Sequence, residues 1–264
     1  MCTFVLLQRV HPDYPVVIAA NRDEVYARPT AAAAVLVEEP RVVGGRDRRS
    51  GGTWLGATAA GFVAGLTNQR TWRLPDPALR SRGEVVLEAL RRGSVDGVEA
   101  LLAGLDPRAY NPFNLVYGDA GGLRVAYARP DRERVELDAV PDGVHVLPND
   151  RLDAPGFAKV ARARALAARA GSPRELGRLL GDHHRPDLAE VTPPPPGSPF
   201  DRALARELDA LCVHTPAYGT RSATVLALVD GAVARYLYAD GPPCRTAFAD
   251  LTGLLTARRP SAPR

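Results

Sequence analysis

The second residue of the chain is a cysteine, followed at once by a strand-like run at residues 3–7. Removal of Met1 would leave Cys2 with a thiol and a free α-amine, a nucleophile that carries its own base. Both groups exchange protons near neutral pH, since the usual pKa is about 7.7–8.0 for the amine and about 8.5 for the thiol. The alternative is a buried cysteine at the start of a strand, as most unpaired cysteines are.

Four consecutive polar residues, 21–24 (Asn-Arg-Asp-Glu), follow the second apolar run of the chain. If the first two apolar runs pair as an antiparallel hairpin, the end of the second lies beside Cys2. Asp23 would then be able to orient the α-amine, and an arginine would be able to stabilise a thiolate or a substrate carboxylate. On a regular strand, however, Arg22 faces away from Asn21 and Asp23. A charged turn is the simpler interpretation of these four residues.

Two asparagines, Asn68 and Asn149, each stand at the end of an apolar run. A strand that ends there delivers a neutral amide donor to its rim. Such donors stabilise the oxyanion of a tetrahedral intermediate by about 3–4 kcal/mol each. Asparagine is also common in turns, so a purely structural role remains open for both residues.

The elements that must position these residues follow from the pattern of apolar residues and turns. Strands come as antiparallel hairpins and helices come in pairs, which favours α+β layers over a doubly wound parallel sheet. Ser81 has Glu84 three residues on, the spacing of a capping box. We expect one domain, residues 1–264. The predicted strands are 3–10, 15–21, 51–58, 62–68, 113–119, 122–128, 134–140, 143–149, 220–230 and 233–240; the predicted helices are 81–93, 94–105, 156–170, 172–182 and 201–212, with an extended proline loop at 192–199.

Composition restricts the classes of function. The chain has 264 residues, is 45% hydrophobic and carries a net charge of +4, with its arginines scattered among acidic residues. Only 6% of residues are aromatic, so the basic stripe with interleaved aromatics of a nucleic-acid-binding protein is not indicated. We find no signal peptide and no segment for stable membrane insertion, and we expect a cytoplasmic protein.

The three cysteines, Cys2, Cys212 and Cys244, show no CxxC spacing. This argues against a disulfide framework and against a zinc site. The run at residues 182–184 (Asp-His-His) lies between a helix end and the proline loop and is interpreted as a solvated loop. The sequence therefore predicts no metal site.

Several short motifs occur in the same order as in a known family: MCT, ANRDE, GGTWLG, LTNQR, SRGE, FNLVYGD, LPND and YGTRSAT. On these motifs the chain resembles the NRDE family, which includes the transport and Golgi organisation protein 2 group, from residue 1 to about residue 230. The resemblance implies an N-terminal nucleophile (Ntn) hydrolase with a four-layer αββα sandwich.

Within that superfamily the plan is similar to bile salt hydrolases and penicillin V acylases, which also begin Met-Cys-Thr. Those acylases have arginine immediately before the first asparagine, whereas Ala20 stands there in this chain, and Arg22 is the candidate substitute. The resemblance implies these catalytic residues: Cys2 as nucleophile, Asp23 to hold its amine, Asn68 and Asn149 as oxyanion-hole and amine-orienting amides, and Arg221 and Arg22 as cations.

The contacts expected with substrate involve Asn21, Trp54, Arg70 and Ser222. The predicted function is an amidohydrolase that cleaves an amide or thioester of a small acyl compound, with no cofactor. A different class remains open, because the eukaryotic side of the family is associated with haem trafficking and acyl-CoA homeostasis. A non-catalytic protein of that kind would bind haem or acyl-CoA, and an acyltransferase would use the same acyl-enzyme. The sequence assigns no oligomeric state.

Overall fold

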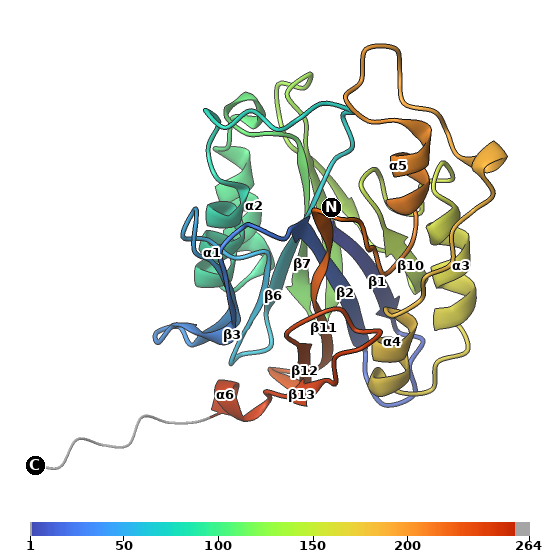
Figure 1. Ribbon diagram of the computed structural model, residues 1–264. Helices are drawn as coiled ribbons and strands as arrows, with labels where there is room; N and C mark the ends of the chain where they lie inside the picture. Colours follow the sequence, from blue (N-terminus) through green and yellow to red (C-terminus); the bar gives the residue numbers. More distant parts are fainter. Residues whose placement is uncertain (1, 257–264) are drawn as a thin grey trace, which may run out of the picture.

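The computed structural model describes residues 2–256, which form two antiparallel sheets with helices on their outer faces (Figure 1). The six-stranded sheet has the order β10-β1-β2-β11-β12-β13, and the seven-stranded sheet runs β3 to β9 in sequence order. The six-stranded sheet contains β1 (Cys2–Gln8), β2 (Val16–Val25), β10 (Gly143–Leu147), β11 (Tyr218–Val229), β12 (Ala232–Ala239) and β13 (Ala249–Asp250). The seven-stranded sheet contains β3 (Thr30–Val37), β4 (Val42–Asp47), β5 (Leu55–Thr58), β6 (Val63–Asn68), β7 (Phe113–Asp119), β8 (Gly122–Ala128) and β9 (Glu136–Ala139).

The helices form the two outer layers. Helices α1 and α2 pack on the seven-stranded sheet, whereas α3 and α4 pack on the six-stranded sheet (Figure 1). The two sheets therefore lie face to face, each with a pair of helices behind it. The helical segments are α1 (Arg82–Arg92), α2 (Val95–Ala103), η1 (Pro107–Ala109), α3 (Ala158–Ala167), α4 (Pro173–Leu179), η2 (Leu188–Glu190), α5 (Arg202–Glu207) and α6 (Gly253–Thr256).

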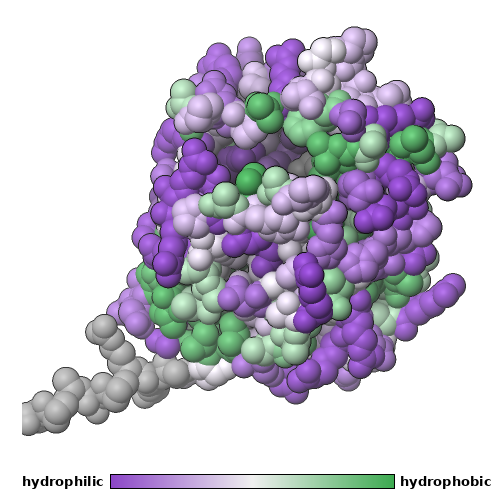
Figure 2. All heavy atoms as spheres, in the orientation of Figure 1, coloured by the Kyte–Doolittle hydropathy of each residue, from purple (hydrophilic) through white to green (hydrophobic). Residues whose placement is uncertain are grey.

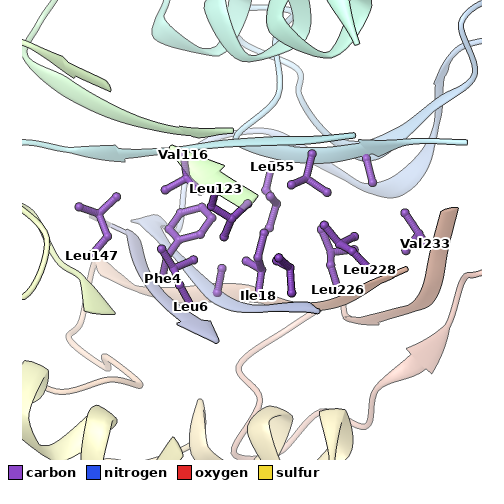
Figure 3. Close-up of a cluster of buried hydrophobic side chains, with 14 of the residues drawn as sticks. Phe4, Leu6, Ile18, Leu55, Val116, Leu123, Leu147, Leu226, Leu228 and Val233 are labelled. Atoms are coloured by element: carbon purple, nitrogen blue, oxygen red, sulfur yellow. The ribbon is translucent and has the colours of Figure 1, made fainter. Parts of the chain in front are cut away.

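Side chains alternate along β1 because successive strand residues point to opposite faces. Phe4 and Leu6 enter the cluster between the two sheets, where they meet residues such as Leu55 (Figure 3). Val5 and Leu7 point the other way, into the apolar layer under α3 and α4. The same alternation continues along β2 and decides which of its polar residues faces which layer.

The predicted hairpins are confirmed. Strands β1 and β2 pair antiparallel, as do β5 and β6, and β11 and β12 turn around Gly231. Gly231 has φ +66°, a left-handed conformation that favours glycine. Helix α2 begins after Ser94, whose hydroxyl accepts a hydrogen bond from the Gly97 N–H.

The structure differs from the sequence prediction in its elements and in one helix cap. Strands β3, β4 and β13 and helix α6 were not predicted; in β3, Thr30 is followed by four alanines, which have low β propensity. Helix α1 does begin after Ser81, but the Ser81 side chain makes no capping hydrogen bond, so the expected capping box is absent.

Throughout residues 2–256, none of the helices has the length and apolar character needed to cross a bilayer. Hydrophilic residues cover most of the face shown in Figure 2, and hydrophobic residues form only small separate groups there.

Candidate active site

The register of the first hairpin places Arg22 directly opposite Cys2. Directly opposed residues of an antiparallel pair share one face of the sheet, so both side chains face the seven-stranded sheet. On that side the Arg22 guanidinium lies over the ring of Trp54, 4.1 Å from its centroid. The predicted proximity of residues 21–24 to Cys2 is thus confirmed. The inference that Arg22 points away from Asn21 and Asp23 also agrees with the geometry, and it is this orientation that brings Arg22 to the cysteine.

Asp23 follows on β2 and is buried beside β11. Its Oδ1 accepts a hydrogen bond of 2.6 Å from the Thr220 hydroxyl, and its backbone carbonyl accepts one of 2.9 Å from the Tyr218 hydroxyl. Burial raises the pKa of the Asp23 carboxyl, while the charge of Lys159 and the Thr220 hydrogen bond act to lower it. Asp23 is therefore a fixed, buried acceptor next to the start of β1.

The two predicted amides lie next to each other and to Cys2. The Asn149 side-chain amide donates to the Asn68 carbonyl at 2.8 Å and to the Cys2 carbonyl at 3.4 Å. Asn149 is 1% exposed, and its Oδ1 has no hydrogen-bond partner among the described residues. The Asn68 side chain ends β6 and lines the same cavity as Cys2. Asn149 thus binds the backbone carbonyls of one residue in β1 and one in β6. Asn68 is the asparagine of the two that lines the cavity.

A cavity of about 320 Å³ opens at this edge of the two sheets. Its size is at the lower end of the range for small-molecule sites. Contributions come from β1, β2, β6, the loop after β4 and the start of α1. The residues that line it include Cys2, Arg22, Asp23, Glu24, Arg28, Asp47, Arg49, Trp54, Asn68, Arg80 and Arg82.

The charges around the cavity fall into two groups. The Arg28 Nη2 lies 2.5 Å from Asp47 Oδ2, and Arg28 also approaches Glu24 at 3.8 Å, so its charge is compensated. By contrast, no carboxylate oxygen of residues 2–256 lies within 4.0 Å of the side-chain nitrogens of the three rim arginines, defined as Arg49, Arg80 and Arg82. Uncompensated cations at a cavity rim favour an anionic ligand group.

Electrostatics at the sulfur act in both directions. On balance the pKa of the Cys2 thiol is raised, chiefly by burial and further by the nearby Asp23 charge. The Arg22 charge lowers it, as does the Asp23 N–H. Burial in turn lowers the pKa of Arg22, and the Cys2 sulfur acts to raise it. Arg22 is therefore the cationic side chain that favours a thiolate at Cys2.

Four sequence-predicted residues lie elsewhere. Asn21 faces the helical layer, where its amide donates to the carbonyls of Leu180 and Leu211 at 2.8 Å each. Arg221 sits at a bulge of β11 and donates to three backbone carbonyls at the end of β2 and in the β2–β3 connection, the shortest at 2.7 Å to Tyr26. These contacts give Arg221 a structural role, and it is not among the described residues that line the cavity.

Arg70 and Ser222 are also outside the set of described residues that line the cavity. The Arg70 guanidinium lies 4.0 Å from the Phe157 ring centroid, where it covers an aromatic face. Ser222 is buried opposite Arg22 in the β2–β11 register. Neither position fits the predicted substrate contact.

Sequence reasoning missed two residues near the site. Lys159 on α3 is 3% exposed, and its Nζ donates to the Leu208 carbonyl at 3.1 Å. Burial lowers the pKa of Lys159, whereas the charges of Asp209 and Asp23 act to raise it. A clue was available, because Lys159 is the chain's single lysine among many arginines. The second residue, Thr220, is part of the motif YGTRSAT. No role was predicted for it, although its hydroxyl donates to Asp23.

Comparison with solved structures identifies the class of fold. The mutant C2A conjugated bile acid hydrolase from Clostridium perfringens superposes with a TM-score of 0.54 at 11% identity, over 97% of this chain and 94% of that chain. An N-acylethanolamine-hydrolyzing acid amidase ortholog from Caenorhabditis elegans gives 0.53 at 12% identity, over 88% and 95%. Likeness at this identity shows the fold alone. The chain has the four-layer αββα sandwich of the Ntn hydrolases, as predicted.

The family follows from sequence comparison. The family model for Transport and Golgi organisation 2 matches residues 1–236. The Transport and Golgi organization protein 2 homolog of Bos taurus is 34% identical over 235 residues, covering 82% of this chain and 83% of the relative. The homolog of Homo sapiens is 31% identical over 232 residues with the same coverage. The chain therefore belongs to the Transport and Golgi organisation 2 family.

Proposed function

We propose that the protein is an N-terminal-cysteine amidohydrolase that acts on a small acyl compound through an acyl-enzyme on Cys2. The observation that carries the proposal is the joint position of Cys2, Arg22 and Asn68 on one cavity, although they come from two different sheets. The mechanism requires removal of Met1, which lies outside the described residues. Once removed, the α-amine of Cys2 becomes the base that the site needs.

The first half of the reaction forms the acyl-enzyme. The Cys2 sulfur attacks the substrate carbonyl carbon, an S–C bond forms, and the carbonyl electron pair moves to the oxygen. The Asn68 side-chain amide, which lines the same cavity, would donate to that oxyanion, and Arg22 would favour the attacking thiolate. When the intermediate collapses, the C–N bond breaks and the leaving amine takes a proton from the Cys2 α-ammonium.

The second half releases the acyl group. The α-amine removes a proton from water, the hydroxide oxygen bonds to the carbonyl carbon, and the S–C bond breaks to regenerate the thiolate. Asp23 is the buried carboxylate beside the start of β1 and would hold the amine in place. A thioester is cleaved by the same steps, with a thiolate as the leaving group.

The substrate we propose carries an anionic group. The rim arginines Arg49, Arg80 and Arg82 line the cavity together with Trp54, which provides an apolar wall. A carboxylate or phosphate would meet the arginines while the acyl chain packs against Trp54. We expect no nucleic-acid partner, and we retain the cytoplasm as the proposed location.

A second candidate rests on the same three arginines. A protein that only binds an acyl-CoA phosphate or haem propionates would use the cationic rim without turnover. It would need neither a free Cys2 amine nor the Cys2 thiol. Acyl transfer, the third option, shares the acyl-enzyme and differs only in the acceptor, an amine in place of water.

The test is trapping of the acyl-enzyme. Wild-type protein and Cys2→Ala are mixed with acyl anilides that have or lack a carboxylate on the acyl chain. After an acid quench, the intact mass of each protein is measured by mass spectrometry. We expect an adduct of the acyl mass on Cys2, released aniline and a preference for the carboxylated substrate. Added hydroxylamine separates transfer from hydrolysis, because it would collect the acyl group. Equal tight binding by both proteins with no adduct and no aniline would contradict the enzyme proposal and favour a binding role.

A further inference from the structure

Outside the cavity described above, four metal-ligating side chains from distant parts of the chain converge at one place. His183, Cys212, His214 and Cys244 bring their ligand atoms within 4.8 Å of one another. This cluster contains two of the three cysteines and two of the five histidines of the chain. None of the four belongs to the proposed catalytic machinery.

The distances within the cluster match a tetrahedral site. His214 Nε2 lies 3.5 Å from Cys212 Sγ and 3.4 Å from Cys244 Sγ. With Zn–S of about 2.3 Å and Zn–N of about 2.0–2.1 Å, a tetrahedron has an S···N edge of about 3.6 Å. One imidazole nitrogen at this separation from two sulfurs is the arrangement that a shared metal ion produces.

His183 is oriented as a metal-bound histidine usually is. Its Nδ1 lies 3.2 Å from the backbone carbonyl of Cys212, an acceptor, so Nδ1 carries the ring proton. The lone pair then resides on Nε2. Donation of the other ring N–H to a carbonyl is the common support of metal-ligating histidines, because it fixes the tautomer and the ring orientation.

The fold brings the ligands together from three segments. His183 follows α4, Cys212 and His214 precede β11, and Cys244 lies in the loop after β12. A Cβ on Gly181 would lie 3.1 Å from the Cys244 Cα, so a glycine at this position lets that loop approach closely. The Cys212 N–H also donates to the Asp182 carbonyl at 2.9 Å, which fixes two of the segments together.

Accessibility also suits a metal. Cys212 is buried, whereas His183 and Cys244 are exposed. A shallow cavity of about 460 Å³, lined by Tyr26, His183, His214, Thr215, Cys244 and Arg245, opens beside them and provides a path for entry. The exposed Arg245 approaches His214 Nδ1 at 3.4 Å. Metal binding at Nε2 puts the proton on Nδ1, so this arginine must move aside.

We propose that His183, Cys212, His214 and Cys244 bind one zinc ion as a structural Cys₂His₂ site. The sequence analysis predicted no metal site, since the spacing contains no CxxC. The four side chains come from three separate segments, so only the fold brings them together. Residues 182–184 do lie in a loop, where His183 and His184 are exposed and Asp182 is half-buried, and His183 is the one that joins the cluster. Four protein ligands complete a tetrahedron, which is typical of structural zinc and leaves no position open for substrate.

The site would fasten the start of β11, and through it Asp23. The segment Cys212–His214 pairs with that strand: the Thr220 N–H donates to the Val213 carbonyl at 2.8 Å, and the Val213 N–H donates to the Thr220 hydroxyl at 2.9 Å. The same hydroxyl donates to Asp23. Metal removal is therefore expected to lower the melting temperature.

The experiment measures metal on the full chain, purified under reducing conditions, and needs no substrate. We expect about one zinc per chain by elemental mass spectrometry. Chelator-treated protein, titrated with Co²⁺ alone, should develop the visible absorption of tetrahedral cobalt and a thiolate charge-transfer band. In Cys212→Ser and His214→Asn, Co²⁺ affinity should fall by more than about 100-fold, beyond the loss typical of supporting residues. Cys2→Ser should bind Co²⁺ as wild type does. Arg245→Gln should bind it at least as tightly, because it removes the side chain that must move away from His214.

The cobalt spectrum of the wild type does not depend on any variant, so a variant that fails to fold leaves the test decisive. Absence of zinc together with no tetrahedral cobalt spectrum would overturn the proposal. So would a Cys212–Cys244 disulfide that persists in protein isolated without air and under reductant, detected as a mass two hydrogens lower.

Discussion

Arg22 shows how a single residue links the hairpin register to chemistry. It is 4% exposed, lies over Trp54 and faces Cys2 across the β1–β2 pair. A buried guanidinium without a full carboxylate partner is expensive, and here its nearest acid, Glu24, is 3.9 Å away. Its cost is offset if a thiolate forms at Cys2, since the two opposite charges then stabilise each other.

This pairing predicts the effect of removing the charge. Arg22→Met keeps the bulk over Trp54 but deletes the cation, so burial and Asp23 raise the pKa of the Cys2 thiol without opposition from Arg22. The pH profile of Cys2 alkylation should shift to higher pH. At pH 7 the rate should fall roughly tenfold, the equivalent of about 1.4 kcal/mol. Iodoacetamide labelling, followed by peptide mass spectrometry across a pH series, measures it.

Arg235→Met on β12 is the matched control, since Arg235 is exposed and does not line the cavity. It should leave the profile unchanged. An unchanged profile in Arg22→Met would show that the guanidinium does not act on the thiol.

At the scale of elements, the site depends on how closely β4 and β5 approach. Trp54 precedes β5 and its indole fills the space over Gly45 on β4, where a Cβ would lie 2.1 Å from the Trp54 Cζ2 atom. A glycine at that position is therefore required for the wall of the cavity. The contact between Gly45 and Trp54 was not predicted from the sequence, because β4 itself was not predicted.

Gly45→Ala should displace Trp54 and loosen its contact with Arg22. We expect a loss of about 1–3 kcal/mol in the free energy of unfolding, the range for overpacking, and a changed tryptophan near-UV circular dichroism signal. Urea titration gives the free energy. Gly156→Ala is the control, because no atom lies within 4 Å of its added Cβ, and surface changes stay within about 0.5 kcal/mol. Equal stability of both variants would contradict this packing.

For the whole molecule, structure formed by residues close in the sequence was predicted, whereas contacts between distant segments were not. Hairpins such as β1–β2 were predictable because each depends on neighbouring residues with a short turn. From that hairpin alone, the proximity of Arg22 and Asp23 to Cys2 followed. The α+β class followed from the hairpins and helix pairs. The four-layer arrangement came from the resemblance to a family, since which sheet packs on which is set by contacts far apart in the chain.

Two arrangements were not predicted, because both depend on contacts between segments that are far apart in the chain. Arg221 was assigned to substrate, but a bulge in β11 turns it toward the carbonyls after β2. His183 and Cys244 are 61 residues apart in the sequence (244 − 183). No local pattern predicts that they lie close together. Only the assembled chain shows either fact.

The most direct test of the central claim is the state and reactivity of residue 2. Protein from its native host is weighed intact, treated with a chelator so that Cys212 and Cys244 carry no metal, and exposed to a limiting dose of iodoacetamide. We expect a mass without Met1 and first labelling at Cys2, although Cys244 is the more exposed cysteine. A chain that keeps Met1, with Cys2 labelled no faster than Cys244, would contradict it.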